Sequence, residues 1–337
     1  MVSMAETTFS ELGRIGAIRN LFEGSPYKAF DELSLAAQAG EQILSCSKLL
    51  LEGIDFDLVY FPLKHLGYKS VVAVTGELYA GMASPETLSV VLGVSAKLDY
   101  SQISELWQGM LAACTEHGFK KTALDLQPSQ NGLSISLSAC GRISAETVSN
   151  RPSPKTRDLV CVTGRLGAAY LGQMLLEKEK LRFDSGASER SEELEKNKML
   201  VAAYLKPELP QNLPARLQEA GMLPSAGCLV NRGLADAALR LGRQTGLGVK
   251  IYAEKIPFEG NSFAVGKELD IDPVSAAMNG GDDLQLLFTI PILQAEEFRK
   301  EFQTFDIIGH LALSEAGTVL VLPTGVEMPL TAQGWSD

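Results

Sequence analysis

Residues 279–289 read NGGDDLQLLFT, and this stretch decides the fold of the second half of the chain. Two glycines and two aspartates are typical of a turn, and the apolar run after them predicts a strand over 285–289. Taken alone, a GGDD turn is most often a solvated hairpin whose carboxylates face water. The alternative is that Asp282 and Asp283 line a binding site, and the rest of the sequence has to decide between the two.

Strands and helices alternate on both sides of this stretch. In the second half we expect strands over 159–162, 248–252, 307–311 and 319–322 and helices over 167–179, 212–220, 233–245 and 293–302, with a charged segment at 180–197. In the first half we expect helices over 11–22, 62–79 and 101–117 and strands over 42–46, 88–94, 122–126 and 132–140. Asn131 and Gly132 read as the turn of an antiparallel hairpin. The pattern predicts an α/β (α+β) protein.

Length and composition set further limits. A chain of 337 residues with 45% hydrophobic and 21% charged residues is long enough for two globular domains. The polar stretch 151–156 carries two prolines, so we predict one domain over 1–150 and another over 151–337.

The charge balance and the cysteines exclude several classes of protein. Acidic residues exceed basic ones by 41 to 30, a net charge of −11, which argues against nucleic-acid and anionic-membrane partners. The five cysteines form no CxxC pair, so a disulfide framework or a zinc site is not expected. No apolar stretch reaches 18 residues and no signal peptide precedes the first helix, so we expect a cytoplasmic protein.

Several segments together carry a resemblance to one family. The stretch 279–289 is similar to the signature GGEDYELLFT, residues 50–57 (LLEGIDFD) to LVEGVHFD, and residues 62–69 (PLKHLGYK) to PxxLGxK. Residues 159–169 (LVCVTGRLGAA) match the strand, turn and helix with which the second domain of this family begins. Residues 332–335 (AQGW) match the GW at the end of the family's sequences. In this order, the motifs resemble the thiamine-monophosphate kinase family of the aminoimidazole-ribonucleotide-synthetase superfamily.

The resemblance implies a fold and a reaction. The implied fold has an N-terminal domain whose mixed sheet pairs with that of a second subunit in a homodimer, a C-terminal α/β domain, and a nucleotide between them. The implied reaction converts ATP and thiamine monophosphate into ADP and thiamine diphosphate. Such phosphoryl transfer uses Mg²⁺ and carboxylates to hold it. ATP, Mg²⁺ and a small phosphorylated substrate are therefore the ligands that the family suggests.

The acidic positions of the family are largely altered here. Its GDDAAV becomes AFDELS at 29–34, which keeps Asp31, and its STD becomes CSK at 46–48, which introduces Lys48. Its SDLAAMG becomes GELYAGM at 76–82, with Glu77, and its GGDT becomes ALDL at 123–126, with Asp125. Its DISDG becomes LVNRG at 229–233, so that both aspartates are lost, one of them to Arg232.

These changes weaken the expected metal site. A positive charge at ~4 Å from a metal repels it by about 4 kcal/mol per unit charge at an effective dielectric of about 20, and the charge of Mg²⁺ doubles that value. If a metal is retained, Asp31, Glu77 and Asp125 are its expected ligands. We expect the ligand-binding residues of the site to be these eight: Lys48, Glu77, Asp125, Asn231, Arg232, Gly233, Asp282 and Asp283.

Each candidate also has a plain structural interpretation. Glu77 can belong to a buried pair, Asp31 can face solvent beside Glu32, and Arg232 can be a surface residue at a helix start. Asp270 and Asp272 precede Pro273 and fit helix capping better than a metal site. His65 and His117 fit structural roles.

Three functions follow from these observations. The preferred one is a catalytically weak or silent relative that binds a phosphorylated small molecule. The second is an active thiamine-monophosphate kinase with an unusual metal site, and the third is another ATP-using enzyme of the superfamily. In the silent relative, Lys48 and Arg232 either bind a phosphate group directly or are neutralised by Glu77, Asp125 or Asp282.

Overall fold

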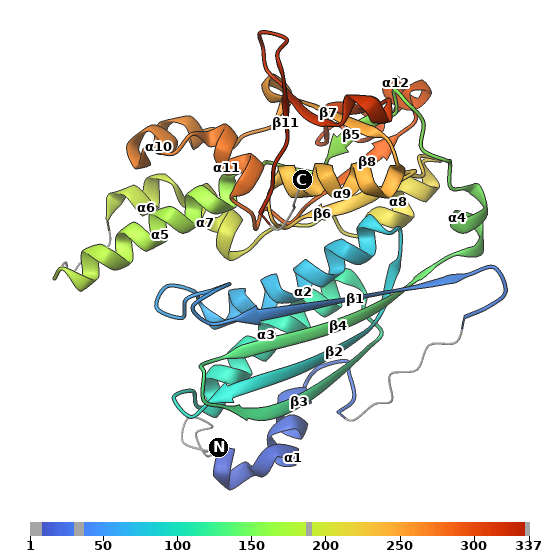
Figure 1. The fold of residues 1–337 in the computed structure, drawn as a ribbon. Coiled ribbons are helices and arrows are strands. Elements are labelled where there is room, and N and C mark those ends of the chain that lie inside the picture. Colours follow the sequence, from blue (N-terminus) through green and yellow to red (C-terminus); the bar gives the residue numbers. More distant parts are fainter. Residues whose placement is uncertain (1–8, 30–36, 187–190, 334–337) are drawn as a thin grey trace. The chain divides into compact units, whose positions relative to one another are not determined.

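The computed structural model describes residues 9–29, 37–186 and 191–333. By their internal contacts these residues form two compact units (Figure 1). The first unit contains the described residues up to Leu78 together with Ala83–Ala145, and the second contains Tyr79–Met82 and the described residues from Glu146 onward. Asp31 and the GW ending lie outside the described residues. Within the described residues, no helix combines the length and the apolar character that a membrane span needs.

The first unit contains a four-stranded mixed sheet. Its strands are β1 (Gln42–Leu51), β2 (Ser84–Ser95), β3 (Lys121–Ser129) and β4 (Ser134–Ile143), in the order β1-β4-β2-β3. β2 and β3 pair in parallel, whereas β4 pairs antiparallel with both β1 and β2.

The predicted hairpin at Asn131 and Gly132 is therefore wrong. β3 and β4 follow each other in sequence, but β2 lies between them in the sheet. The helical crossover from β2 to β3 places β3 on one side of β2, so the chain has to pass the end of β2 to reach its other side. Gly132 still makes a turn, with φ of 83°.

Helices cover one face of this sheet (Figure 1). They are α1 (Phe9–Phe22), α2 (Leu63–Ala80) and α3 (Tyr100–His117), and Asp99 and Gln102 form a capping box at the start of α3. α2 and α3 cross closely, because a Cβ atom at Gly67 would collide with the carbonyl of Leu106 and one at Gly109 with that of Lys64. Only glycine allows this approach of the two backbones.

The opposite face of the sheet carries none of these helices. Leu49, Ser136, Val91 and Asp125 form one row across the four strands on this face. The side chains of Leu49 and Val91 are 53% and 39% exposed, respectively. The next row, with Lys48, Leu137, Val90 and Leu124, points to the helix-covered side, because successive residues of a strand alternate between the faces.

The second unit contains a seven-stranded sheet in the order β11-β10-β7-β9-β5-β8-β6. Its strands are β5 (Leu159–Val162), β6 (Gly227–Val230), β7 (Gly248–Tyr252), β8 (Gln285–Ile290), β9 (Asp306–Ala312), β10 (Thr318–Val321) and β11 (Glu327–Pro329). Its α-helices are α4 (Ala145–Asn150), α5 (Ala168–Asp184), α6 (Glu192–Lys196), α7 (Lys198–Leu205), α8 (Leu213–Glu219), α9 (Leu234–Thr245), α10 (Ser262–Leu269), α11 (Pro273–Asn279) and α12 (Ala295–Glu301).

Apolar residues of α9 and of the central strands form the main core of this unit. Ala235, Ala238 and Leu241 of α9 belong to the same buried cluster as Val160 of β5 and Leu287 of β8. A second group of aromatic rings, Phe288, Phe298, Phe302 and Phe305, connects β8 with α12. The stretch 279–289 thus ends in a fully integrated strand, as its apolar run predicts.

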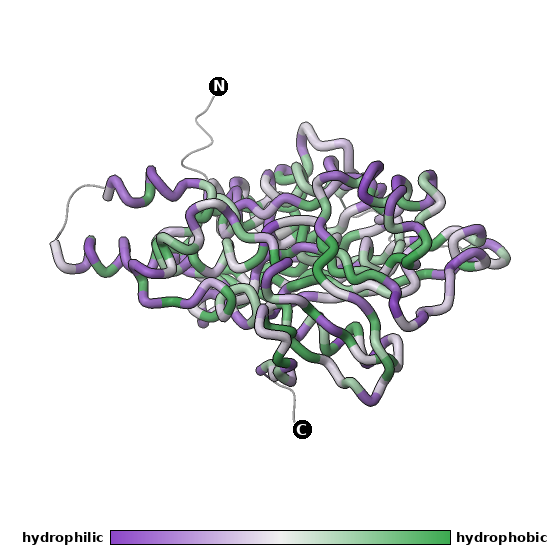
Figure 2. The backbone as a smooth tube through the Cα atoms, turned by 90° about the horizontal axis from the view of Figure 1, so that it is seen from above, coloured by the Kyte–Doolittle hydropathy of each residue, from purple (hydrophilic) through white to green (hydrophobic). Residues whose placement is uncertain are grey.

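Some elements lie in segments where the sequence predicted none, namely α4, α7, α10, β6 and β11. The predicted charged segment 180–197 contains the end of α5 and the short helix α6, and Figure 2 shows their hydrophilic character. Asp272 caps α11 as predicted, since its carboxylate accepts a hydrogen bond from the backbone N–H of Ser275 at 2.9 Å.

Candidate functional site

Two loops of the second unit bring most of the predicted site residues together. The backbone N–H of Asp282 donates to the carbonyl of Asn231 at 2.8 Å, and that of Leu284 donates to the carbonyl of Val230 at 2.9 Å. β6 and β8 pair antiparallel, so the loop after β6 meets the loop before β8. The loops 231–233 and 281–284, which lie about fifty positions apart in the sequence, therefore form one corner of the unit.

Asp283 is the anchor of this corner. Its side chain is only 4% exposed. One carboxylate oxygen accepts a hydrogen bond from the backbone N–H of Gly167 at 2.8 Å, and the other accepts one from Ala169 at 3.2 Å. Gly167 is the N-cap residue of α5 and Ala169 lies in its first turn, where backbone N–H groups have no partner within the helix. The carboxylate thus caps α5 and stabilises the positive end of the helix dipole.

The other residues of the corner are more accessible. Arg232 is exposed, and Asn231 and Asp282 are half-buried. Gly233 has φ of 91°, and a Cβ atom there would collide with the carbonyl of Met278. This glycine therefore serves the close packing of the start of α9 against the end of α11. Arg232 forms no ion pair with another described residue.

The predicted residues of the first unit are divided between the two faces of its sheet. Lys48 and Cys46 share the helix-covered side of β1, and the Cys46 thiol lies 3.4 Å from the carbonyl oxygen of Val74 on α2. Glu77 belongs to α2, which covers this side, and burial together with the negative charge of Glu77 raises the pKa of Cys46 to about 12. Asp125 lies on the opposite face, where it accepts a hydrogen bond from Gln127 at 2.8 Å.

This arrangement does not fit a magnesium site within the described residues. Glu77 and Asp125 cannot share one ion across the sheet, and Asp31 lies outside the described part of the chain. No group of three or more His, Cys, Asp or Glu residues in the described ranges is placed to hold a metal ion. Because Mg²⁺ prefers oxygen ligands in octahedral geometry, isolated carboxylates hold it weakly.

A cavity of about 400 Å³ opens beside Asp283 in the second unit. This volume lies within the range of small-molecule sites. The turn between β5 and α5, the end of α7 and the segment 206–210 form most of its wall. The lining residues are Thr163, Gly164, Arg165, Ala168, Met199, Ala202, Ala203, Lys206, Pro207, Glu208, Leu209, Pro210, Arg216, Glu259, Asp283, Gln285, Thr304 and Phe305.

Hydrogen bonds fix the floor of this cavity. The hydroxyl of Thr163 donates to the side-chain carbonyl of Gln285 at 2.8 Å, and the Gln285 amide donates to the backbone carbonyl of Glu208 at 3.2 Å. These bonds connect β5, β8 and the segment after α7. The side chains of Thr163 and Gln285 are therefore held in place before a ligand arrives, which lowers the entropy cost of binding to them.

The wall of the cavity offers both charge and aromatic surface. Arg165, Lys206 and Arg216 supply positive charge, and Glu208, Glu259 and Asp283 supply negative charge. The guanidinium of Arg216 also lies over the ring of Phe302, 5.6 Å from its centroid. Arg165 forms an exposed ion pair with Asp306 at 3.4 Å, which holds its guanidinium only loosely. Such a wall can bind the phosphate of a small molecule and pack against its planar part.

Apart from Asp283, sequence reasoning did not identify the residues of this cavity. The available signals were the turn at 163–165, which follows a predicted strand, and Gln285 within the signature stretch. Lys206, Arg216 and Phe305 carry no such signal, because the tertiary fold alone brings them beside the turn.

Comparison with known proteins connects this fold to a family. No family model matches the chain. The thiamine-monophosphate kinase of Synechococcus elongatus is 27% identical over 292 residues, which cover 85% of this chain and 84% of that protein. The enzyme of the same name from Aquifex aeolicus is 24% identical over 283 residues, 83% of this chain and 87% of its own length. Over most of its length the chain is similar to thiamine-monophosphate kinases, which supports the resemblance of its motifs.

Several solved structures have a fold similar to that of this chain. The thiamine monophosphate kinase of Aquifex aeolicus superposes with a TM-score of 0.70 at 21% identity and covers 87% of this chain and 92% of its own. A ThiL protein complexed with AMPPCP and TMP gives 0.69 at 20% identity, with 96% of each chain covered. E. coli HypE gives 0.67 at 16% identity over 95% of this chain and 96% of its own. The two-sheet α/β fold that the resemblance implied is confirmed.

Proposed function

We propose that the chain binds the small phosphorylated ligands of its family, thiamine monophosphate and ATP, and transfers phosphoryl groups weakly or not at all. The observation that carries this proposal is the loop after β6. The family has one aspartate at the end of β6 and one in this loop, where this chain has Leu229, which is 1% exposed, and the exposed Arg232. A cation in place of a metal ligand repels Mg²⁺ by several kcal/mol.

The binding part of the proposal rests on the cavity beside Asp283. Its three cationic side chains suit a phosphate group, and its aromatic surface suits a heterocycle. A ThiL relative forms a complex with AMPPCP and TMP, which supports ligands of these two classes. Arg165 and Lys206 would hold the phosphate, and Gln285, fixed by Thr163, would help to orient the ligand.

A coupled assay of ADP formation from ATP and thiamine monophosphate with Mg²⁺ tests the catalytic part. We expect turnover at least ~10³-fold below that of a family member with all aspartates, or roughly 4 kcal/mol of lost transition-state stabilisation. Turnover in the ordinary range of enzymes would instead support the active kinase with an unusual metal site.

Calorimetric titration of thiamine monophosphate without Mg²⁺ tests the binding part. The double variant Arg165→Ala/Lys206→Ala should weaken binding about tenfold or more, because it removes two charged hydrogen-bond donors. Lys196→Ala is the matched control, since the side chain of Lys196 is 72% exposed and does not line the cavity. Equal affinity of the double variant and the wild type would refute the assignment of the cavity.

A further inference from the structure

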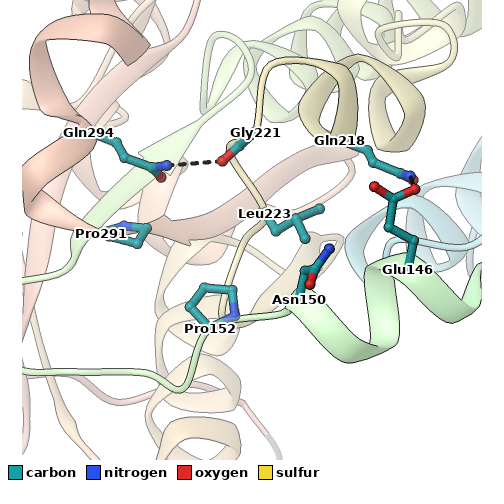
Figure 3. Close-up of a pocket in the computed structure, with 8 residues that line it drawn as sticks. All are labelled: Glu146, Asn150, Pro152, Gln218, Gly221, Leu223, Pro291 and Gln294. Atoms are coloured by element: carbon teal, nitrogen blue, oxygen red, sulfur yellow. Dashed lines mark hydrogen bonds between the residues drawn. The ribbon is translucent and has the colours of Figure 1, made fainter.

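A second cavity of the second unit, of about 330 Å³, shares no lining residue with the cavity beside Asp283. It lies where α4, the segment after it, the end of α8 and the segment after β8 meet (Figure 3). Its lining residues are Glu146, Asn150, Pro152, Gln218, Gly221, Leu223, Pro291 and Gln294. The proposed function makes no use of this space.

One side of the cavity presents an oriented carboxylate. The hydroxyl of Thr147, a residue that is 2% exposed, donates to the side-chain carbonyl of Gln218 at 2.9 Å. The amide of Gln218 then donates to Oε2 of Glu146, also at 2.9 Å. Both ends of Gln218 are therefore engaged, and Oε1 of Glu146 accepts no hydrogen bond from a described residue. This chain of bonds leaves one carboxylate oxygen ready to accept a donor.

The other side contains a buried amide oxygen of Gln294. The Nε2 atom of Gln294 donates to the backbone carbonyl of Gly221 at 2.9 Å. Its Oε1 atom is buried and has no hydrogen-bond partner among the described residues. In Figure 3 Gln294 and Glu146 lie on opposite sides of Leu223. A buried acceptor without a donor is unfavourable, so a ligand that supplies an N–H group to it gains stability.

Part of the remaining lining is apolar, and the charge in the lining is negative. Pro152, Leu223 and Pro291 supply the apolar surface, and Glu146 is the only charged residue in the lining. The whole chain has a net charge of −11, which adds a long-range attraction for positive ligands. An anion would meet the Glu146 carboxylate with no cation in the lining to offset it.

We propose that this cavity binds a small organic cation with N–H donors, such as an ammonium or an amidinium group on a short apolar body. The cationic group donates to Oε1 of Glu146, and a further N–H group satisfies Oε1 of Gln294. The apolar body packs against the two prolines and Leu223. This site is separate from the proposed phosphate-binding cavity and adds a second ligand class to the chain.

Titration of the full chain with benzamidine, followed by NMR and calorimetry, tests this proposal. We expect saturable binding below about 10 mM, with binding of the neutral isostere benzamide about tenfold weaker and no binding of benzoate. Glu146→Gln should weaken benzamidine binding about tenfold, whereas Glu192→Gln, at a side chain that is 90% exposed, should leave it unchanged.

A blocking variant provides an independent test that does not depend on Glu146. Asn150 is an exposed residue at the end of α4, so Asn150→Trp fills the cavity from its rim and should abolish binding without disturbing the core. The proposal is overturned if benzamide binds as well as benzamidine, if Glu146→Gln and Asn150→Trp both bind normally, or if no saturation is reached.

Discussion

The carboxylate of Asp283 accepts a hydrogen bond from the backbone N–H of Gly167 at 2.8 Å, although 116 positions separate the two residues. With the second bond to Ala169, this contact connects the signature stretch to the first turn of α5. An internal anion thus already occupies the helix end that a phosphate could otherwise approach. Asp283 shapes the wall of the cavity beside it and also stabilises the unit.

Asp283→Ala should therefore destabilise the protein by about 2–3 kcal/mol, because two buried N–H groups lose their acceptor. Urea denaturation at neutral pH measures this change. Asp282→Asn is the control: it keeps a residue type that tolerates the positive φ of 62° and should change the free energy of unfolding by less than about 0.5 kcal/mol. A small effect of Asp283→Ala would show that the capping bonds contribute little.

Arg232 should bind phosphate directly. Because it is exposed, forms no ion pair with another described residue and lies at the start of α9, we expect phosphate without Mg²⁺ to raise the melting temperature by about 2–4 °C. Arg232→Ala should reduce this shift, and the shift that remains should belong to the cavity lined by Arg165 and Lys206. Arg19→Ala, at an exposed position of α1, should retain it. If Arg232→Ala instead destabilises the protein equally with and without phosphate, an internal ion-pair role is favoured.

The uncovered sheet face of the first unit should pair with a second copy of the chain. Leu49 and Val91 lie on either side of Ser136 on this face, and they are 53% and 39% exposed, respectively. We expect a dimer by sedimentation at micromolar concentration, and Leu49→Asp should shift it toward monomer because the charge would be buried at the interface. Lys196→Ala should leave the dimer intact. A monomeric wild type would contradict this prediction.

Stability should fall in mild acid because of His117. This residue is 1% exposed, and burial lowers its pKa below the usual value. The unfolded chain then binds a proton more readily than the folded chain, so the stabilisation is complete above about pH 6.5 and declines as the pH falls below that value. The decline should reach up to about 1.4 kcal/mol per pH unit until the folded pKa is passed.

Urea denaturation between pH 8 and pH 5 measures this dependence. In His117→Asn the dependence should become flatter, because no group titrates at this position. An unchanged slope in the variant would assign the acid sensitivity to other groups, such as His310, whose pKa burial also lowers.

Local signals in the sequence determined the elements and their ends. The strand over 159–162 and the helix over 101–117 lie where apolar periodicity predicts them, within one residue. Asp272 followed by Pro273 marks the start of α11, because a cap and a proline act within one turn of their own position. The family motifs also identified the fold, since they preserve the order of these elements.

Only the tertiary structure decided which of these residues meet. The pairing of β2 with β3 excludes the hairpin at Asn131, and the strand register places Lys48 and Asp125 on opposite faces of one sheet. The contact of Asp283 with Gly167 and the arrival of Lys206 beside Arg165 likewise depend on packing between distant segments. Periodicity reports the burial of a residue along its own element, whereas strand order and long-range partners follow from the packing of the whole unit.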